Sequence, residues 1–118
     1  MANRSVPAFM IGAVANVTFA APETLTGALT LTYDAYNANI LKLDPGGASR
    51  NVTLWPEESS KGMWALIVNA ADAAENLVLK DDAASPTTIA TVNQNEAAIV
   101  ACNGTAWTLI CILSIALS

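Results

Sequence analysis

The chain has 118 residues, of which 53% are hydrophobic and 13% are charged, and it carries a net charge of −5 without any histidine. A chain of this length suits a single domain. The acidic balance argues against nucleic-acid binding, which needs clustered Lys and Arg. The missing histidine removes the commonest general base and transition-metal ligand. Because ordinary globular domains carry roughly 25% charged residues, we expect part of the apolar surface to be buried against other chains.

The first twelve residues contain Pro7 and Gly12 and show no clear hydrophobic period. This composition predicts an extended N-terminal arm, residues 1–12, which orders when it meets a partner. The residues expected to contact that partner are Val6, Pro7, Phe9, Met10 and Ile11. The start of the chain has no basic region followed by a long apolar core, so we expect no secretory signal and folding in a cytoplasm.

Residues 13–118 are expected to form a single β domain. A first strand is predicted from Ala13 to Phe19, and the run from Ala28 to Tyr33 alternates strictly between apolar and polar residues, as a half-buried strand does. Turn residues separate the further β-rich runs, which are residues 39–43, 51–55, 63–68, 76–80, 87–92, 96–102 and 106–110. Short strands at this spacing predict an all-β fold: an antiparallel, jelly-roll-like β-sandwich, or alternatively a small β-tulip barrel.

Two of these runs allow more specific expectations. The run from Trp64 to Val68 is apolar on both faces, which places it in the middle of the sandwich or under a neighbouring subunit. If residues 103–105 form a hairpin turn, Cys102 opposes Ala106 and Cys111 opposes Ala97. The thiols then lie on opposite faces, about 16 Å apart at roughly 3.3 Å per residue. A disulfide needs Cα atoms within about 7 Å, so we expect both cysteines to be reduced and buried.

Residues that could carry chemistry are few. The acidic pairs Glu57-Glu58 and Asp81-Asp82 fall in predicted loops and are interpreted as solvated turns. Calcium is the metal that such oxygen ligands would suit, but no Asp-x-Asp-x-Asp-Gly loop is present. No serine or threonine has an evident activating base. We therefore predict no enzyme, no cofactor and no metal site. The apolar C-terminal run is shorter than the about 20 residues of a membrane helix, so no membrane contact is expected either.

The tryptophans are the best candidates for recognition. Trp107 is expected in the core, on one hairpin face with Leu109, Cys111, Ile99 and Ala97. Trp55 stands at a strand end, before Pro56 and the acidic pair, and is the candidate for a partner contact. An exposed sugar-binding platform of Trp55 with Tyr33 and Tyr36 is the alternative use of these aromatics.

Three segments carry a resemblance to a known class of protein. They are residues 39–54, NILKLDPGGASRNVTL, residues 62–72, GMWALIVNAAD, and residues 88–107, TIATVNQNEAAIVACNGTAW. With the residues between them they span residues 39–107, which is 69 of the 118 residues. This combination resembles the small β-rich virion proteins of tailed bacteriophages. In these proteins a strand with an Arg-x-Val-x-Leu-Pro pattern, a strand with a Gly-x-x-x-x-Ile-x-Asn pattern and a closing Asp/Asn-Gly-Thr-x-Trp hairpin recur. Here Trp55 intervenes between Leu54 and Pro56, which departs from that pattern.

The resemblance implies a structural virion protein, most like a head decoration (cement) protein. Such a protein would bind the major capsid protein on the outside of the capsid, as a homotrimer, after being made in the cytoplasm of the bacterial host. A receptor- or glycan-binding module of a tail or fibre tip is the second function that the resemblance allows.

Overall fold

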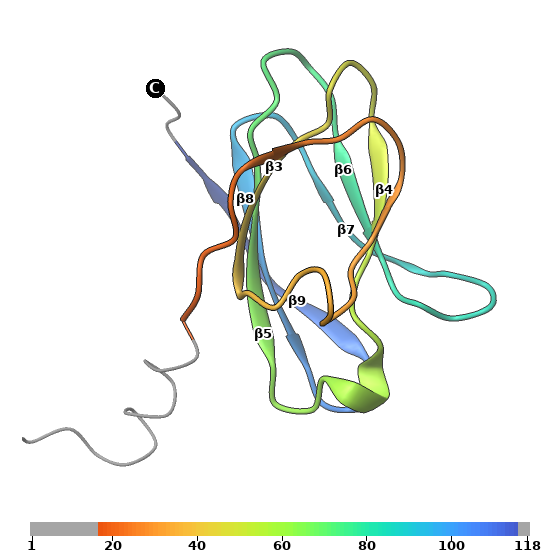
Figure 1. The fold of residues 1–118 in the computed structure, drawn as a ribbon. Coiled ribbons are helices and arrows are strands. Elements are labelled where there is room, and N and C mark those ends of the chain that lie inside the picture. The colour runs from red at the N-terminus through yellow and green to blue at the C-terminus, as the bar shows by residue number, and fades with distance from the viewer. Residues whose placement is uncertain (1–16, 116–118) are drawn as a thin grey trace, which may run out of the picture.

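The computed structural model describes residues 17–115, which fold into two β-sheets packed against each other (Figure 1). The larger sheet has five strands in the order β1 (Glu23–Thr24), β3 (Ile40–Asp44), β5 (Trp64–Asn69), β8 (Glu96–Cys102) and β9 (Trp107–Ser114). The smaller has four, in the order β2 (Leu29–Thr30), β4 (Arg50–Thr53), β6 (Leu77–Lys80) and β7 (Thr88–Val92). A 3-10 turn, η1 (Glu57–Ser59), follows β4. The predicted all-β sandwich is confirmed.

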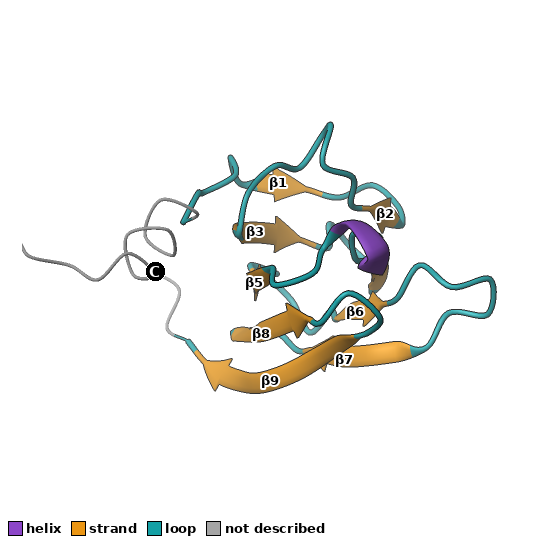
Figure 2. Cartoon of the chain, turned by 90° about the horizontal axis from the view of Figure 1, so that it is seen from below, coloured by secondary structure: helices purple, strands orange, loops and turns teal. Residues whose placement is uncertain are grey.

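The order of the strands differs from the expected jelly-roll-like pattern. From β1 to β6 the chain changes sheet with every strand, so that β1, β3 and β5 pair in parallel and β2, β4 and β6 do the same. Antiparallel pairing is limited to β5–β8, β6–β7 and β8–β9. Parallel neighbours need a long crossover, and here a strand of the opposite sheet provides it. Figure 2 shows the two layers from their end, with β1, β3, β5, β8 and β9 in one row.

The predicted runs correspond closely to the strands from β3 onward, and the predicted run 96–102 has the same bounds as β8. Two differences stand out. The strictly alternating run 28–33 supplies only the two-residue strand β2, and β9 continues to Ser114, beyond the predicted end at residue 110. Most of the first predicted strand, like the arm of residues 1–12, lies outside the described residues. Its described end makes one parallel bridge, between Phe19 and Ile40.

The core lies between the two sheets, where the alternating residues of each strand meet. On β5, Ala65 and Ile67 point inward and are fully buried. Fully burying a Leu or Ile side chain stabilises the fold by about 1.5–3 kcal/mol, so the interior aliphatic residues dominate its stability. The largest buried apolar side chains are Trp55, Leu31, Leu41, Leu43, Leu54, Ile67, Leu77, Leu79, Val52, Val92 and Val100.

The buried side chain of Asn69 connects the two sheets by hydrogen bonds. Asn69, the last residue of β5, is fully buried. Its Nδ2 donates to the carbonyl oxygens of Glu75, at 2.8 Å, and Val92, at 2.9 Å, while its Oδ1 accepts the backbone N–H of Ala71 at 2.9 Å. Because Val92 ends β7 in the other sheet, this single amide joins both layers and the loop between β5 and β6.

Candidate interaction surface

The outward side of the five-stranded sheet is the most unusual surface of the molecule. Cross-strand partners share one face of a sheet, and the register pairs Ile40 with Leu66, Leu66 with Ile99, and Ile99 with Cys111. All four point away from the core, opposite the buried Ile67 and Val100. We call this surface the apolar face; it comprises Phe19, Ile40, Trp64, Leu66, Val68, Ala97, Ile99, Ala101, Cys111 and Leu113.

The edges of the apolar face are the most exposed. Phe19, beside Ile40 at one edge, is 74% exposed, and Leu113 on β9 at the other edge is 41% exposed. Trp64, Leu66 and Val68 on the central strand β5 are half-buried by their neighbours in the sheet. Ala97, on β8, is fully buried. Water therefore meets the apolar face mainly at its two edges and only in part at β5 and Ile99.

A bulge in β9 helps to build this face. The register changes between Ile99, which pairs with Cys111, and Val100, which pairs with Leu109, so Ile110 has no partner and is 59% exposed. Such an extra residue shifts the following side chains to the other side of the sheet. Trp107 and Leu109 therefore face the core, whereas Cys111 and Leu113 face outward. The expectation that Trp107 shares a face with Cys111, Ile99 and Ala97 is wrong. The bulge turns Cys111 outward, and the turn pairs Trp107 with Cys102, which puts Trp107 on the opposite face from Ile99 and Ala97.

The two cysteines lie on opposite faces, as expected, but in a different register. Cys102 pairs with Trp107 instead of Ala106, because the turn holds four residues, 103–106, tied by the Asn103 side chain. Neither cysteine forms a disulfide. Cys102 is buried as expected, whereas Cys111 is partly exposed on the apolar face.

The outward side of the four-stranded sheet has the opposite character. Its register aligns Asn51 with Val78 and Thr91, and Thr53 with Lys80 and Thr88. Val78 is the one large apolar residue among them. Polar residues on the solvent side of a half-buried sheet are the usual arrangement. The apolar face is therefore a specific property of the five-stranded sheet. In the sequence, only the run from Trp64 to Val68 indicated it.

The predicted contact residue Trp55 does not belong to any surface. It is 2% exposed, its Nε1 donates to the carbonyl of Tyr36 at 2.9 Å, and its ring stacks on Tyr33 with 5.7 Å between centroids. The expectation that Trp55 contacts a partner is thus wrong, because the chain turns inward after β4 and buries the ring. The arm residues Val6, Pro7, Phe9, Met10 and Ile11 lie outside the described residues.

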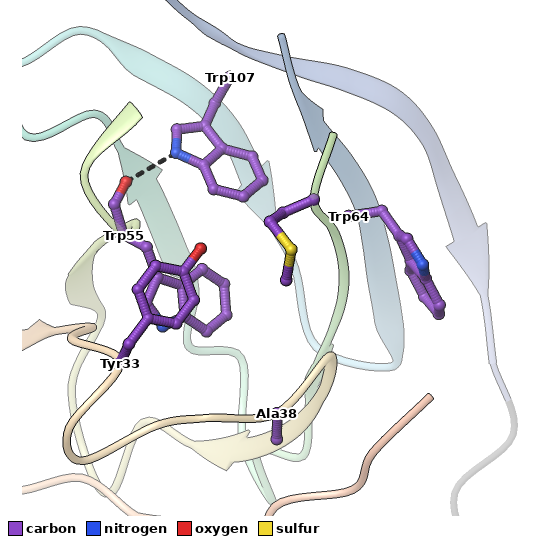
Figure 3. Close-up of a pocket in the computed structure, with 6 residues that line it drawn as sticks. Tyr33, Ala38, Trp55, Trp64 and Trp107 are labelled. Carbon is purple, nitrogen blue, oxygen red and sulfur yellow. Dashed lines mark hydrogen bonds between the residues drawn. The ribbon is translucent and has the colours of Figure 1, made fainter. Parts of the chain in front are cut away.

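The aromatic residues form an interior cluster instead of a sugar-binding platform. Trp107 is buried beside Trp55, with 5.9 Å between ring centroids, as the sequence predicted for Trp107. The recess that they line with Tyr33, Met63 and Trp64 has no space for a water molecule. Figure 3 shows Trp64 pointing away from the other two tryptophans. Its register with Ala101 places it on the apolar face. Because the ring of Trp55 is buried, it cannot form an exposed glycan-binding platform with Tyr36.

Tyr36 is held by an acidic residue. Its hydroxyl donates to Glu23 Oε1 at 2.6 Å. The hydrogen bond to Glu23, followed by burial and the negative charge of Glu23, raises the pKa of Tyr36 to about 12. This pair ties the loop before β3 to β1 and leaves Tyr36 protonated in neutral solution.

Acidic side chains from separate loops come together at two places. Carboxylate oxygens of Glu57, Glu58 and Asp82 lie within 4.8 Å of one another, and so do those of Asp44, Asp72 and Glu75. A hydrogen bond with Asp82 is the main reason that the pKa of Glu57 is raised, followed by burial. Hard oxygen ligands of this kind suit calcium, but exposed acids such as Glu58 and Asp72 are also ordinary solvated surface. The sequence predicted that Glu57-Glu58 and Asp81-Asp82 lie in turns, but it could not show that these two turns meet.

In comparisons with known proteins, no family model, no curated protein and no solved structure matches the chain. Within residues 17–115 no helix is long and apolar enough to cross a membrane. Fold and surface together define a small mixed β-sandwich with one apolar and one polar outer face.

Proposed function

We propose that this chain is a structural virion protein of a tailed bacteriophage, which binds the outside of the capsid as a decoration (cement) protein and acts as a homotrimer. The observation that carries the proposal is the apolar face. In an isolated monomer, Leu66, Ile99 and their neighbours would stay in contact with water, which is unfavourable for apolar side chains. An assembled protein would bury them.

The location of the phage-like segments supports the same proposal. Residues 39–54 include β3 and β4, residues 62–72 include β5, and residues 88–107 run from β7 through β8 to the start of β9. The resemblance therefore concerns the strands of the sandwich themselves, including the hairpin turn at Gly104, whose φ of 96° favours glycine.

The mechanism would be adhesion. The rigid sandwich presents its apolar face to neighbouring protein, and the arm with Val6, Pro7, Phe9, Met10 and Ile11 adds a strand to an exposed edge of the major capsid protein. Many modest contacts over the shell would resist the pressure of the packaged DNA. The acidic loops around Glu57 and Asp82, directed to solvent, would keep decorated particles apart through their negative charge.

Immuno-electron microscopy tests the proposal directly. Antibodies raised against the recombinant chain are applied to intact particles of a tailed phage whose genome encodes it. Labelling of heads supports the decoration function. Labelling of the tail or fibre tip would replace it by the receptor-binding alternative, and particles without any label would overturn both.

A further inference from the structure

The apolar face approaches the size of a stable interface. Four strands build it, β3, β5, β8 and β9, and at a spacing of about 4.8 Å and lengths of about 17–26 Å they give roughly 400 Å² of flat area. Protruding side chains, and Phe19 beside β3, add accessible surface to this value. A stable interface buries about 600–1,000 Å² on each partner, so the face comes near the lower end of that range when it is covered from edge to edge.

Charge on the apolar face also favours contact between identical chains. Among residues 17–115, only two charged residues fall on this side by their register, Lys42 and Asp44, and they have opposite signs. The whole chain carries −5, so most of its surfaces would repel a second copy. The apolar face is the broad surface on which two copies could meet without bringing net like charge together.

From these two observations we infer that the apolar face is the self-association surface, and that a second copy of this chain covers it. The apolar face of each copy then packs against a neighbouring copy in the assembly, with Leu66 and Ile99 near the centre of the contact and Phe19 and Leu113 at its edges. The inference rests on the proposed function only in treating the apolar face as the working surface, and its test requires no capsid.

The test compares the mass of the full-length protein in solution with that of two matched lysine variants. Leu66→Lys places a charge at the centre of the apolar face. Val78→Lys places one at a half-buried position of β6, on the outward side of the other sheet. Light scattering coupled to size exclusion gives the mass at several concentrations. We expect the wild type and Val78→Lys to form assemblies of two or more 12.2 kDa chains, and Leu66→Lys to be a monomer.

Cys111 supplies a second measurement within the same face. In the assembled protein its thiol is covered, so alkylation of Cys111 should be at least about tenfold slower in the wild type than in Leu66→Lys. Cooperative thermal unfolding of each variant verifies its fold, and Ile99→Thr replaces Leu66→Lys if the latter does not fold.

Each remaining outcome overturns the inference. A monomeric wild type with reactive Cys111 shows an uncovered face. A monomeric wild type with protected Cys111 shows that residues 1–16 of the same chain cover it. An assembly that withstands Leu66→Lys and Ile99→Thr uses another surface. None of these outcomes decides whether phage heads are labelled, so the proposed function is tested separately.

Discussion

The indole N–H of Trp107 donates a hydrogen bond of 2.8 Å to the main-chain carbonyl of Trp55, which lies 52 positions earlier in the chain. This bond is buried and connects the first residue of β9 with the segment that leaves β4. Because β9 belongs to the five-stranded sheet and β4 to the four-stranded sheet, the Trp107–Trp55 pair closes one end of the sandwich. Asn69 makes the equivalent connection where β5 ends.

Replacing Trp107 by Phe should therefore destabilise the protein. The aromatic ring is largely kept, but the buried carbonyl of Trp55 loses its partner, and leaving such a group unsatisfied costs about 1–3 kcal/mol. Urea denaturation at fixed protein concentration measures the free energy of unfolding. Thr108→Ala, an exposed change on the same strand, is the control and should cost less than about 1 kcal/mol. Equal losses for both variants would contradict the role of the hydrogen bond.

Asn69→Leu should lower the free energy of unfolding further than Trp107→Phe, although leucine is more apolar than asparagine. The substitution leaves the backbone groups of Glu75, Val92 and Ala71 without the hydrogen bonds that Asn69 provides, and we expect a loss of about 3 kcal/mol or more. Asn51→Leu, at an exposed position of β4, should change the free energy of unfolding by less than about 0.5 kcal/mol. The same denaturation experiment compares the two, and a neutral Asn69→Leu would show that the buried amide is dispensable.

Two adjacent glycines in the turn after β3 offer a matched comparison. Gly46 has a φ of 76°, and a Cβ added there would collide with the carbonyl oxygen of Leu25; Gly47 has a φ of 106°, but a Cβ there would meet nothing. Gly47→Ala should cost only the backbone strain, about 1–2 kcal/mol. Gly46→Ala should cost about 3 kcal/mol or more, because the collision is with backbone that cannot move aside cheaply. Thermal unfolding measures both, and the opposite order would be incompatible with this turn.

The raised pKa of Glu57 predicts a specific pH dependence of stability. The folded chain keeps a proton on Glu57 above the ordinary carboxyl pKa of 4.5, where the unfolded chain releases it. Stability from this group is therefore complete below pH 4.5 and is lost as the pH rises through the higher folded value.

In the wild type this loss of stability should appear as a melting temperature that falls as the pH rises. Glu57→Gln should make that fall smaller. At neutral pH, where repulsion between Glu57 and Asp82 is relieved, the gain should be about 1–2 °C, small because these groups are largely exposed and screened. Melting curves recorded from pH 4 to 8 give the comparison. Asp34→Asn, which removes an exposed acid outside the cluster, should keep the wild-type profile, and an unchanged profile in Glu57→Gln would refute the coupling.

Much of the fold could be predicted because its signals are local. The bounds of β8 and the positions of β3 to β7 followed from short β-rich runs interrupted by Gly, Pro, Asn and Asp, which act on the backbone within a few residues. The burial of Trp107 and the two-sided apolar character of Trp64 to Val68 were also evident. Trp55 was misplaced because nothing near it in sequence indicates that Tyr33 and Trp107 surround its ring.

The sequence by itself determined that this chain makes short strands, that the run Trp64 to Val68 is apolar on both sides, and that no histidine is present. These properties depend on residue type and alternation, which operate along the chain. Only the tertiary structure decided that β1, β3 and β5 run parallel, that a bulge at Ile110 turns Cys111 outward, and that Glu57 meets Asp82. Pairing between distant segments decides each of these, because register and direction are set by the partner strand. The apolar face exists for the same reason: Ile40, Leu66 and Ile99 become one surface only when three strands align.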